Sequence, residues 1–351
     1  MLNSIKVLLL YSELADYLLS SLKSLNYEVN EIHVVHWPVN KEAPFKFNNI
    51  DDIKFYDRKS RNYSQLVKLS KEINPAIILC SGWIDKDYIR LIKNHKKSIP
   101  TILLFDNPWR GAFRQFMATL ISPFTLKKIF THCWLPGSRA KVFAQKLGFS
   151  ESQILTGLYS ADTPKFSKFR NDFFDLKKIK FPKVFLYVGR YVKHKGLFEL
   201  WNAFIELQNE DPSDWELWCL GTGEEFENRI IHPKIKHFGF IQPSNMINYL
   251  SKSGVYILPS IYEPWGVSVH EMASAGFPML LSENVGSSEV FLKDNLNGYF
   301  FKAENTKDLK DKMRRIIDLK ESELLTMSDK SYDLSLINSP KIWANKLISL
   351  L

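Results

Sequence analysis

The chain has 351 residues, of which 45% are hydrophobic and 24% are charged, and its formal net charge is +9. This length favours two domains over one compact core, and the composition is that of an ordinary globular protein. No apolar stretch approaches the roughly 20 residues that a membrane-spanning helix requires.

The first residues, MLNSIKVLLLYS, predict a β-strand and not a signal peptide, because the apolar run is short and no small-residue cleavage site follows it. Cys80, Cys133 and Cys219 are scattered and lack the spacing of metal ligands. We expect them to be reduced core residues of a cytoplasmic protein.

Short apolar runs alternate with helical patterns along the chain, which is typical of parallel sheets with helices on both faces, here in two domains, 1–162 and 163–335. A charged stretch at 162–182 separates the two series and is predicted to be irregular. Strands are predicted at 5–10, 31–36, 53–56, 76–80, 101–105, 132–135 and 153–156, and then at 184–188, 216–220, 235–238, 255–258, 279–281 and 298–300. Helices in the first half are predicted at 12–25, 63–73, 85–95 and 138–147.

The positive charge is concentrated in the first part of the chain. Residues 1–150 carry 22 Lys and Arg against 12 Asp and Glu, or +10, and the remainder carries 25 against 26, or −1. Either a solvated basic face or attraction to an anionic partner explains this bias. Between Asp106 and Glu151 there is no acidic residue, and the basic residues there are Arg110, Arg114, Lys127, Lys128, Arg139, Lys141 and Lys146.

The stretch GVYILPSIYEPWGVSVHEMASAGFPMLLSENVGSSEVFLKDNLNGYFF, 254–301, carries the clearest chemical signal. A buried strand leads into a short loop with Glu263, and a helix that opens near Gly266 carries Glu271. At the carboxyl end of an α/β strand, both carboxylates would face the crevice where such sheets bind ligands. Carboxylates accept hydrogen bonds from diols, so the pair predicts a sugar, a ribose or both. His270, inside the same helix, is predicted to be a packing residue.

Two earlier strand ends carry further candidate residues. In FLYVGRYVKHKG a strand ends at Gly189, and Arg190 and Lys195 follow, which suits a phosphate group near backbone N–H groups. In LGTGEE a strand leads to Gly221 and Gly223, and a helix with acids in its first turn is predicted after them.

Five segments in this order, GRYVKHKG, LGTGEE, FGFIQ, SIYEPWGVSVHEMASAG and NVGSSEVFLKDNLNGYFF, resemble the retaining glycosyltransferases of family 4, in the glycosyl transferases group 1. The resemblance covers 184–301 and also Trp343 and Ala344 in the last helix. It implies an α/β protein of the GT-B fold, with two Rossmann-like parallel-sheet domains facing each other across a cleft. The C-terminal helix, 336–351, would pack back towards the first domain.

The resemblance also implies a function. The protein would move a sugar, with retention of anomeric configuration, from a nucleotide-diphosphate-sugar to a hydroxyl acceptor in the synthesis of cell-surface polysaccharide, lipopolysaccharide or glycolipid. A GT-B phosphorylase, a sugar-nucleotide epimerase and a non-catalytic nucleotide-sugar-binding protein are the alternatives. The expected partners are the nucleotide-sugar donor and a glycan or lipid-linked acceptor, and no nucleic acid is expected.

Position by position, the resemblance implies roles for the candidate residues. Arg190 and Lys195 would bind the diphosphate and stabilise charge on the leaving nucleotide. Glu263 would contact the transferred sugar, and Glu271 would hold the ribose hydroxyls. Because preorganised cations can stabilise a leaving group without a metal, no metal or other cofactor is expected. The remaining donor-binding positions are Gly189, Gly221, Phe240, Ile241, Gly266, Val267 and Ser268.

The first half departs from the family pattern. The glycine-rich loop that usually follows the first strand is absent from LLLYSELADYLL, and Asp106 stands in LLFDNPWRG where many members have His. Asp106 is therefore a candidate for contacting the sugar or the acceptor hydroxyl, and an Asx turn leading into Pro108 is the alternative. Asp85 and Asp87 imitate the metal-binding pair of the other glycosyltransferase fold, but they are predicted to begin a helix.

The segment RGAFRQFMATLISPFTLKKIF, 110–130, combines four basic residues with large apolar side chains. This combination suits an anionic bilayer surface, where a lipid-linked acceptor would be presented, and predicts a cytoplasmic protein attached peripherally to the inner face of the membrane. Alternatively, the apolar residues are the core face of an ordinary helix that Pro123 ends. These apolar residues are Phe113, Phe116, Met117, Leu120, Ile121, Phe124 and Phe130.

Overall fold

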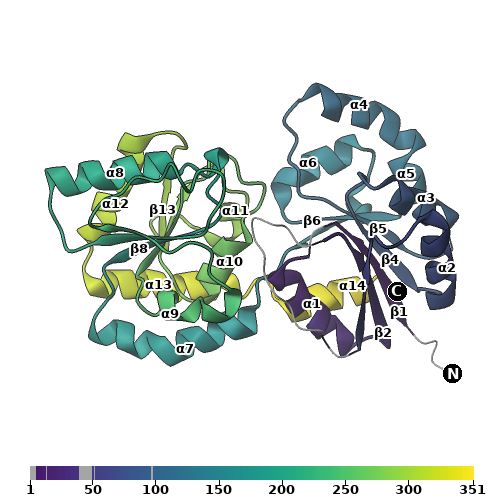
Figure 1. Cartoon of the computed structure of the whole chain (residues 1–351), viewed down its shortest axis with the longest axis horizontal. Coiled ribbons are helices and arrows are strands. Elements are labelled where there is room, and N and C mark those ends of the chain that lie inside the picture. Colours follow the sequence, from purple (N-terminus) through teal and green to yellow (C-terminus); the bar gives the residue numbers. More distant parts are fainter. Residues whose placement is uncertain (1–4, 13, 39–49, 51, 96–97) are drawn as a thin grey trace. The chain divides into compact units, whose positions relative to one another are not determined.

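The computed structural model describes residues 5–12, 14–38, 50, 52–95 and 98–351, which divide into two compact units (Figure 1). The first unit contains the described residues up to Ser160 together with Asn338–Leu351, and the second is Ala161–Ile337. Each unit is a parallel sheet covered by helices, as the sequence predicts.

The sheet of the first unit has the strand order β3-β2-β1-β4-β5-β6-β7. Its order reverses between β1 and β4, which are paired directly. In such sheets the crevice at the carboxyl ends of the two strands is the usual place for a ligand. The strands are β1 (Lys6–Tyr11), β2 (Glu31–His36), β3 (Ile53–Asp57), β4 (Ile77–Ser81), β5 (Thr101–Leu104), β6 (His132–Leu135) and β7 (Ile154–Thr156). The helices are α1 (Asp16–Asn26), α2 (Tyr63–Ile73), α3 (Lys86–Asn94), α4 (Phe113–Ile121), α5 (Leu126–Ile129), α6 (Ser138–Lys146) and α14 (Pro340–Ile348).

The sheet of the second unit has the order β10-β9-β8-β11-β12-β13 and reverses between β8 and β11. Its central strands are buried on both faces, which explains why they are near-continuous apolar runs in the sequence. The strands are β8 (Val184–Val188), β9 (Glu216–Leu220), β10 (Ile235–His237), β11 (Val255–Leu258), β12 (Met279–Ser282) and β13 (Gly298–Phe301). The helices are α7 (Thr163–Ile179), α8 (Leu197–Glu210), α9 (Ile247–Leu250), α10 (Val267–Ser274), α11 (Ser288–Phe291), α12 (Thr306–Ile317) and α13 (Glu321–Ser335).

The last helix, α14, is part of the first unit although it follows the second along the chain. Trp343 stacks on Trp134 of β6 with ring centroids 4.9 Å apart, and its indole N–H donates to the carbonyl of Leu158 at 2.8 Å. Both indole rings are almost completely buried, so α14 supplies core packing that the first unit would otherwise lack.

Two sequence predictions are wrong. The stretch 162–182 is not irregular but contains α7, which the Asp162 side chain caps and which buries Phe166 and Phe169. The many charged residues on its exposed side conceal this apolar face in the sequence. The helix predicted after Gly223 is also not formed. Residues 223–228 make turns instead, and the N–H of Glu225 donates to the carbonyl of Tyr191 at 2.9 Å.

His270 of α10 joins three parts of the second unit, and the prediction that it is a packing residue is confirmed. The backbone N–H of Ala161 donates to Nδ1 at 3.0 Å, so Nε2 carries the proton and donates to the carbonyl of Ser335 at 2.9 Å. The ring also stacks on Phe291 at 4.2 Å. A neutral imidazole with both nitrogens hydrogen bonded satisfies the requirement for a buried polar side chain.

All three cysteines are buried, as expected for core residues. Burial raises the pKa of Cys133 and of Cys219 to about 12, which keeps both thiols protonated near neutral pH. None of the helices in the described part of the chain is both long and apolar enough to cross a bilayer.

Candidate functional site

The donor-site residues predicted from the sequence lie on the loops that leave the carboxyl ends of the second unit's strands. Gly189 and Arg190 follow β8, Gly221 follows β9, and Glu263 and Gly266 lie between β11 and α10. Since β8 and β11 are the strands at which the order reverses, Arg190 and Glu263 belong to the two loops that flank the expected ligand crevice.

Lys195 and Glu263 form an ion pair at this place. The two residues are 68 positions apart in sequence, and their side chains are only 13% and 12% exposed. A carboxylate has about four lone-pair sites and an ammonium group has three N–H donors, so each group retains hydrogen-bonding capacity for a ligand. The pair therefore fixes both side chains while leaving them able to contact phosphate or hydroxyl groups.

Backbone contacts hold the two loops together beneath this pair. The carbonyl of His194 accepts hydrogen bonds from the N–H of Ile261 at 2.8 Å and of Tyr262 at 3.2 Å. Gly196 has a φ of +67°, and a Cβ atom there would lie 2.2 Å from the carbonyl oxygen of Pro259. Only glycine permits both this backbone conformation and the close contact with Pro259. The position of Lys195 therefore depends on Gly196, the next residue in the chain.

The imidazole of His194 lies in the field of the site's cations. Partial burial lowers its pKa, and the nearby charges of Lys195 and Arg190 lower it further. Sequence reasoning missed His194, because its structural contribution comes from a backbone carbonyl, which no side-chain pattern reveals.

The ends of β8, β9 and β10 are joined in a similar way. The N–H of Gly221 donates to the carbonyl of Gly239 at 2.7 Å, and the N–H of Gly189 donates to the carbonyl of Leu220 at 3.0 Å. A Cβ atom on Gly221 would lie 1.8 Å from the carbonyl oxygen of Gly189. The loops after β8 and β9 can therefore come this close only if residue 221 is glycine. The structure thus gives Gly189 and Gly221 a part in shaping the site.

Buried tyrosines support two of the predicted residues, and sequence reasoning missed both. The hydroxyl of Tyr187 in β8 donates to the backbone carbonyl of Arg190 at 2.8 Å, and the Arg190 side chain is exposed. The hydroxyls of Tyr256 in β11 and Ser268 in α10 are hydrogen bonded at 2.7 Å. Each tyrosine lies in a strand that reads as continuous apolar sequence, where its hydroxyl gives no signal.

The N-terminus of α10 adjoins Glu263. Gly266 precedes the helix, and its Cα lies close enough to the Glu263 side chain that a Cβ atom would be 3.0 Å from Cγ. Val267 and Ser268 form the first turn, where unpaired N–H groups and the helix dipole favour an anion. Glu271 is partly buried in the second turn of α10.

Phe240 and Ile241 follow β10 on the same edge of the sheet, two strands away from β8. Both are partly buried. The structure therefore brings the donor-site candidates onto one edge of the second unit, whereas Asp106 belongs to the first unit.

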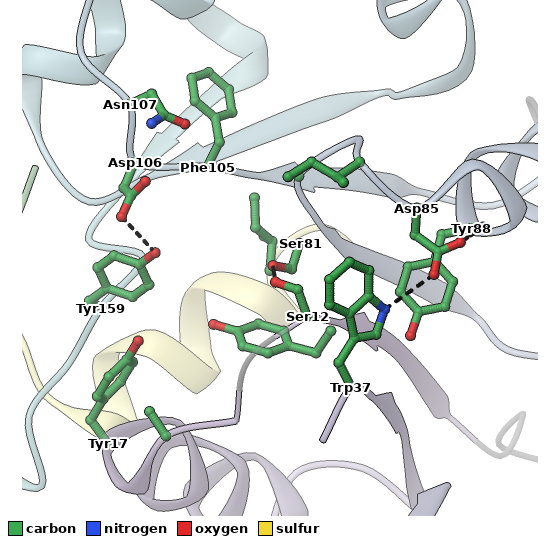
Figure 2. A pocket seen from close by; sticks show the side chains of 15 residues that line it. Ser12, Tyr17, Trp37, Ser81, Asp85, Tyr88, Phe105, Asp106, Asn107 and Tyr159 are labelled. Atoms are coloured by element: carbon green, nitrogen blue, oxygen red, sulfur yellow. Dashed lines mark hydrogen bonds between the residues drawn. The ribbon is translucent and has the colours of Figure 1, made fainter. Parts of the chain in front are cut away.

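Asp106 lines a cavity of about 440 Å³ in the first unit (Figure 2). Its carboxylate accepts a hydrogen bond from the hydroxyl of Tyr159 at 3.3 Å. The cavity lies at the carboxyl ends of β1 and β4, where the order of this sheet reverses. Tyr159 was missed from the sequence because it comes from a loop that is 53 residues away from Asp106.

Asp85 and Asp87 begin α3, as predicted, and both bind Arg58. The guanidinium donates to Asp85 at 2.7 Å and to Asp87 at 2.9 Å, and Asp85 also caps the helix. Burial alone would raise the pKa of Asp85, but the hydrogen bonds from Arg58 and the backbone outweigh it and lower the pKa. These carboxylates are thus occupied in a charge-assisted structural contact.

Comparison with known proteins agrees with this geometry. Residues 168–330 match the protein family described as glycosyl transferases group 1. The chain is 27% identical over 143 residues to the 2-deoxystreptamine N-acetyl-D-glucosaminyltransferase of Niallia circulans, a match that covers 38% of this chain and 34% of that enzyme. The chain spans about a third of the length of the curated relatives that it matches.

The solved structures that resemble the chain cover almost all of it. A glycosyltransferase from Rickettsia africae matches with a TM-score of 0.76 at 14% identity, over 99% of this chain and 98% of that one. HepE of Anabaena, in complex with UDP and glucose, matches with a TM-score of 0.71 at 11% identity, over 97% and 98%. The chain therefore has the GT-B fold, and its segment 168–330 matches the family described as glycosyl transferases group 1.

Proposed function

We propose that the protein is a retaining glycosyltransferase of family 4 that moves a sugar from a nucleotide-diphosphate-sugar to a hydroxyl acceptor. The observation that carries this proposal is the Lys195–Glu263 pair at the strand-order reversal of the second unit, within the segment that matches group 1. The similarity to an N-acetylglucosaminyltransferase and to a structure with bound UDP and glucose supports a nucleotide-sugar as donor.

The principal electrostatic demand of this reaction is the charge that develops on the departing nucleotide diphosphate. Arg190, Lys195 and the N-terminus of α10 supply positive potential on adjacent loops, and this charge is in place before the bond breaks. With a diphosphate present, the three N–H donors of Lys195 are shared between Glu263 and phosphate oxygens. Glu263 thereby positions Lys195 and accepts hydrogen bonds from the transferred sugar.

The remaining assignments follow from position. Glu271, one turn further along α10, accepts hydrogen bonds from the ribose hydroxyls, and Phe240 and Ile241 border the base. Transfer proceeds on the front face of the sugar, where an oxygen of the donor's own phosphate accepts the proton of the acceptor hydroxyl. This route needs neither a strong protein base nor a metal ion.

The product of transfer tests the proposal. With an α-linked donor, such as UDP-glucose, UDP-N-acetylglucosamine or GDP-mannose, and a panel of sugar acceptors, we expect an α-linked product at the anomeric proton in NMR. Excess EDTA should leave the rate nearly unchanged. A β-linked product, or activity that EDTA abolishes and Mn²⁺ or Mg²⁺ restores, would contradict retention or metal independence respectively.

The two glutamates should divide their effects between nucleotide and sugar. Glu271→Ala should weaken binding of the nucleotide diphosphate in calorimetry by roughly ten- to a hundredfold, because a hydrogen bond to a charged group is worth about 1.5–3 kcal/mol. Glu263→Ala should lower kcat/KM for the donor by a similar factor. It should leave nucleotide affinity unchanged or higher, because Lys195 loses a competing anion. Equal losses of nucleotide affinity in both variants would refute the division, and Glu263→Gln serves as the isosteric control.

We extend the proposal to peripheral attachment at an anionic membrane through α4. None of the nine residues of α4, all of which the structure describes, is buried. Phe113 is 77% exposed, Leu120 66% and Phe124 72%, so the prediction that these residues form a core face is wrong. The core-face interpretation holds only further along, where Leu126, Ile129 and Phe130 are buried.

An ordinary surface helix turns its apolar face to the core and its polar face to solvent, and α4 does the opposite. Its large apolar residues recur at positions 113, 116, 117, 120 and 121, along one exposed face. The more covered positions are polar or small, and Gln115 donates to the carbonyl of Pro108 at 2.8 Å. In Figure 1, α4 lies at the periphery of its unit, outside the layer that covers the sheet. With the exposed basic residues Arg110, Arg114 and Lys128 nearby, this face complements an anionic bilayer that presents a lipid-linked acceptor.

Flotation with vesicles tests the attachment. The protein should float with vesicles of phosphatidylglycerol and phosphatidylcholine at low salt, less so at high salt, and not with phosphatidylcholine alone. Replacing Arg110, Arg114 and Lys128 with Gln should weaken binding by on the order of a hundredfold, because each basic residue is worth about 1 kcal/mol at such a surface. The double substitution Phe113→Ser with Leu120→Ser should also weaken binding to the vesicles.

Exposed residues elsewhere supply the controls for flotation. Ile179→Ser with Ile231→Ser removes exposed apolar groups of the second unit, and Lys68→Gln with Lys168→Gln removes exposed charges. Both should float like the wild type. No flotation at low salt, or flotation that the substitutions in 110–128 leave unchanged, would contradict membrane attachment.

A further inference from the structure

Tyr256 is a buried phenol whose hydroxyl reaches the start of α10. It lies in the middle of β11, a strand in which every residue is buried, and it is itself 0% exposed. Its hydroxyl is 2.7 Å from the hydroxyl of Ser268 in the first turn of α10. A phenylalanine would fill the same space without bringing a polar group into the core, so the contact with Ser268 is what the hydroxyl adds.

The direction of this hydrogen bond follows from burial. Burial raises the pKa of Tyr256 well above its ordinary value, the hydrogen bond with Ser268 opposes this rise, and the charges of Glu263 and Glu271 add to it. The phenol therefore keeps its proton at neutral pH. Among the described residues, Ser268 alone is hydrogen bonded to this phenol. Since a buried O–H group requires an acceptor, Tyr256 donates and the Ser268 oxygen accepts.

Ser268 thus keeps its own proton for a different partner. A serine hydroxyl has one O–H donor and two lone pairs, and Tyr256 occupies one of the lone pairs. In the described part of the chain no second group is hydrogen bonded to the Ser268 hydroxyl, and the residue is partly exposed. Because the hydroxyl accepts from Tyr256, its own O–H cannot point at the phenol and is turned away from the core.

The Ser268 hydroxyl lies where an anion is favoured. α10 begins after Gly266 without a side-chain cap, and within the described residues the N–H groups of Val267 and Ser268 have no acceptor. The helix dipole adds positive potential at this end. The Glu263 side chain adjoins Gly266 and is paired with Lys195. A hydroxyl proton beside unpaired N–H groups suits an anionic oxygen, because a hydrogen bond to a charged acceptor is stronger than one to a neutral acceptor.

We propose that the Ser268 hydroxyl donates a hydrogen bond to the distal phosphate of the nucleotide diphosphate, and that Tyr256 is the positioning residue that holds this hydroxyl as a donor. This inference rests on the proposed function, in which Glu263 contacts the transferred sugar. The phosphate that carries the sugar then lies next to Glu263, at the start of α10. The inference goes beyond the backbone groups there, since it gives a side chain part of the discrimination between a nucleoside diphosphate and a nucleoside monophosphate.

Calorimetry on the full chain with UDP, GDP and ADP, and with UMP, GMP and AMP, tests the inference. Ser268→Ala should weaken binding of the tightest nucleoside diphosphate by about tenfold or more, as expected for a hydrogen bond to a charged group, and should leave its monophosphate unaffected. Ser268→Thr retains a hydroxyl and should retain most of the affinity. Tyr256→Phe should weaken diphosphate binding severalfold, because the Ser268 O–H is then no longer held in one orientation.

A double substitution separates positioning from a structural effect. If Tyr256 acts through the Ser268 hydroxyl, Tyr256→Phe should cause no further loss of diphosphate affinity when Ser268 is already Ala. A general disturbance of the fold would instead lower the affinity by the same factor in both backgrounds.

Two matched variants serve as controls. Tyr88→Phe removes a buried phenol of the first unit that donates to the carbonyl of Val35 at 3.3 Å. Ser322→Ala removes an exposed serine at the second position of α13, the position that Ser268 has in α10. Both should leave nucleotide affinity unchanged.

The outcomes distinguish this inference from the proposed function. An unchanged diphosphate affinity in Ser268→Ala, equal losses for diphosphate and monophosphate, or the same effect of Tyr256→Phe with and without the Ser268 hydroxyl would overturn the inference. The proposed function would still stand in those cases, because the wild type binds the diphosphate. If the wild type binds no nucleotide at millimolar concentration, the proposed function and the inference both fail.

Discussion

The contact between the loops after β8 and β11 is the constraint on which the candidate donor site depends. The His194 carbonyl binds two N–H groups of the β11 loop, and Gly196 lets the chain approach Pro259. This contact brings Lys195 and Glu263 together as an ion pair that is largely shielded from water. A charged pair in this position costs desolvation energy, and replacement of such pairs by apolar residues is often neutral or stabilising. Its presence is therefore better explained by ligand binding than by stability.

In both units the candidate residues lie where the strand order of the sheet reverses, but the kinds of side chain differ between the units. In both, the strand order reverses next to the first strand of the sheet, and the candidate residues lie on loops at the carboxyl ends. The second unit places Arg190, Lys195 and the start of α10 there, which favour an anion. The first unit places aromatic rings and Asp106 around a cavity there.

The strands, and hence the fold class, could be predicted because buried parallel strands are short apolar runs between turn residues. The α7 helix was missed because its charged face hides Phe166 and Phe169. Motif resemblance identified Lys195 and Glu263, but their pairing could not be predicted, since 68 residues separate them. The cavity could not be predicted either, because Trp37, Asp106 and Tyr159 come from different loops. An amphipathic pattern does not say which side of a helix meets the core, so the exposed face of α4 required the structure.

Hydrogen–deuterium exchange with and without the nucleotide that binds most tightly among UDP, GDP and ADP tests the central claim most directly. If the diphosphate is held at the contact between the β8 and β11 loops, amides in 189–196 and 260–271 should exchange more slowly when it binds. This protection should be lost in Lys195→Met, and the amides around Ser81 and Asp106 should be unaffected. Protection centred on the cavity of the first unit, with none at 189–196 or 260–271, would contradict the assignment of the donor site.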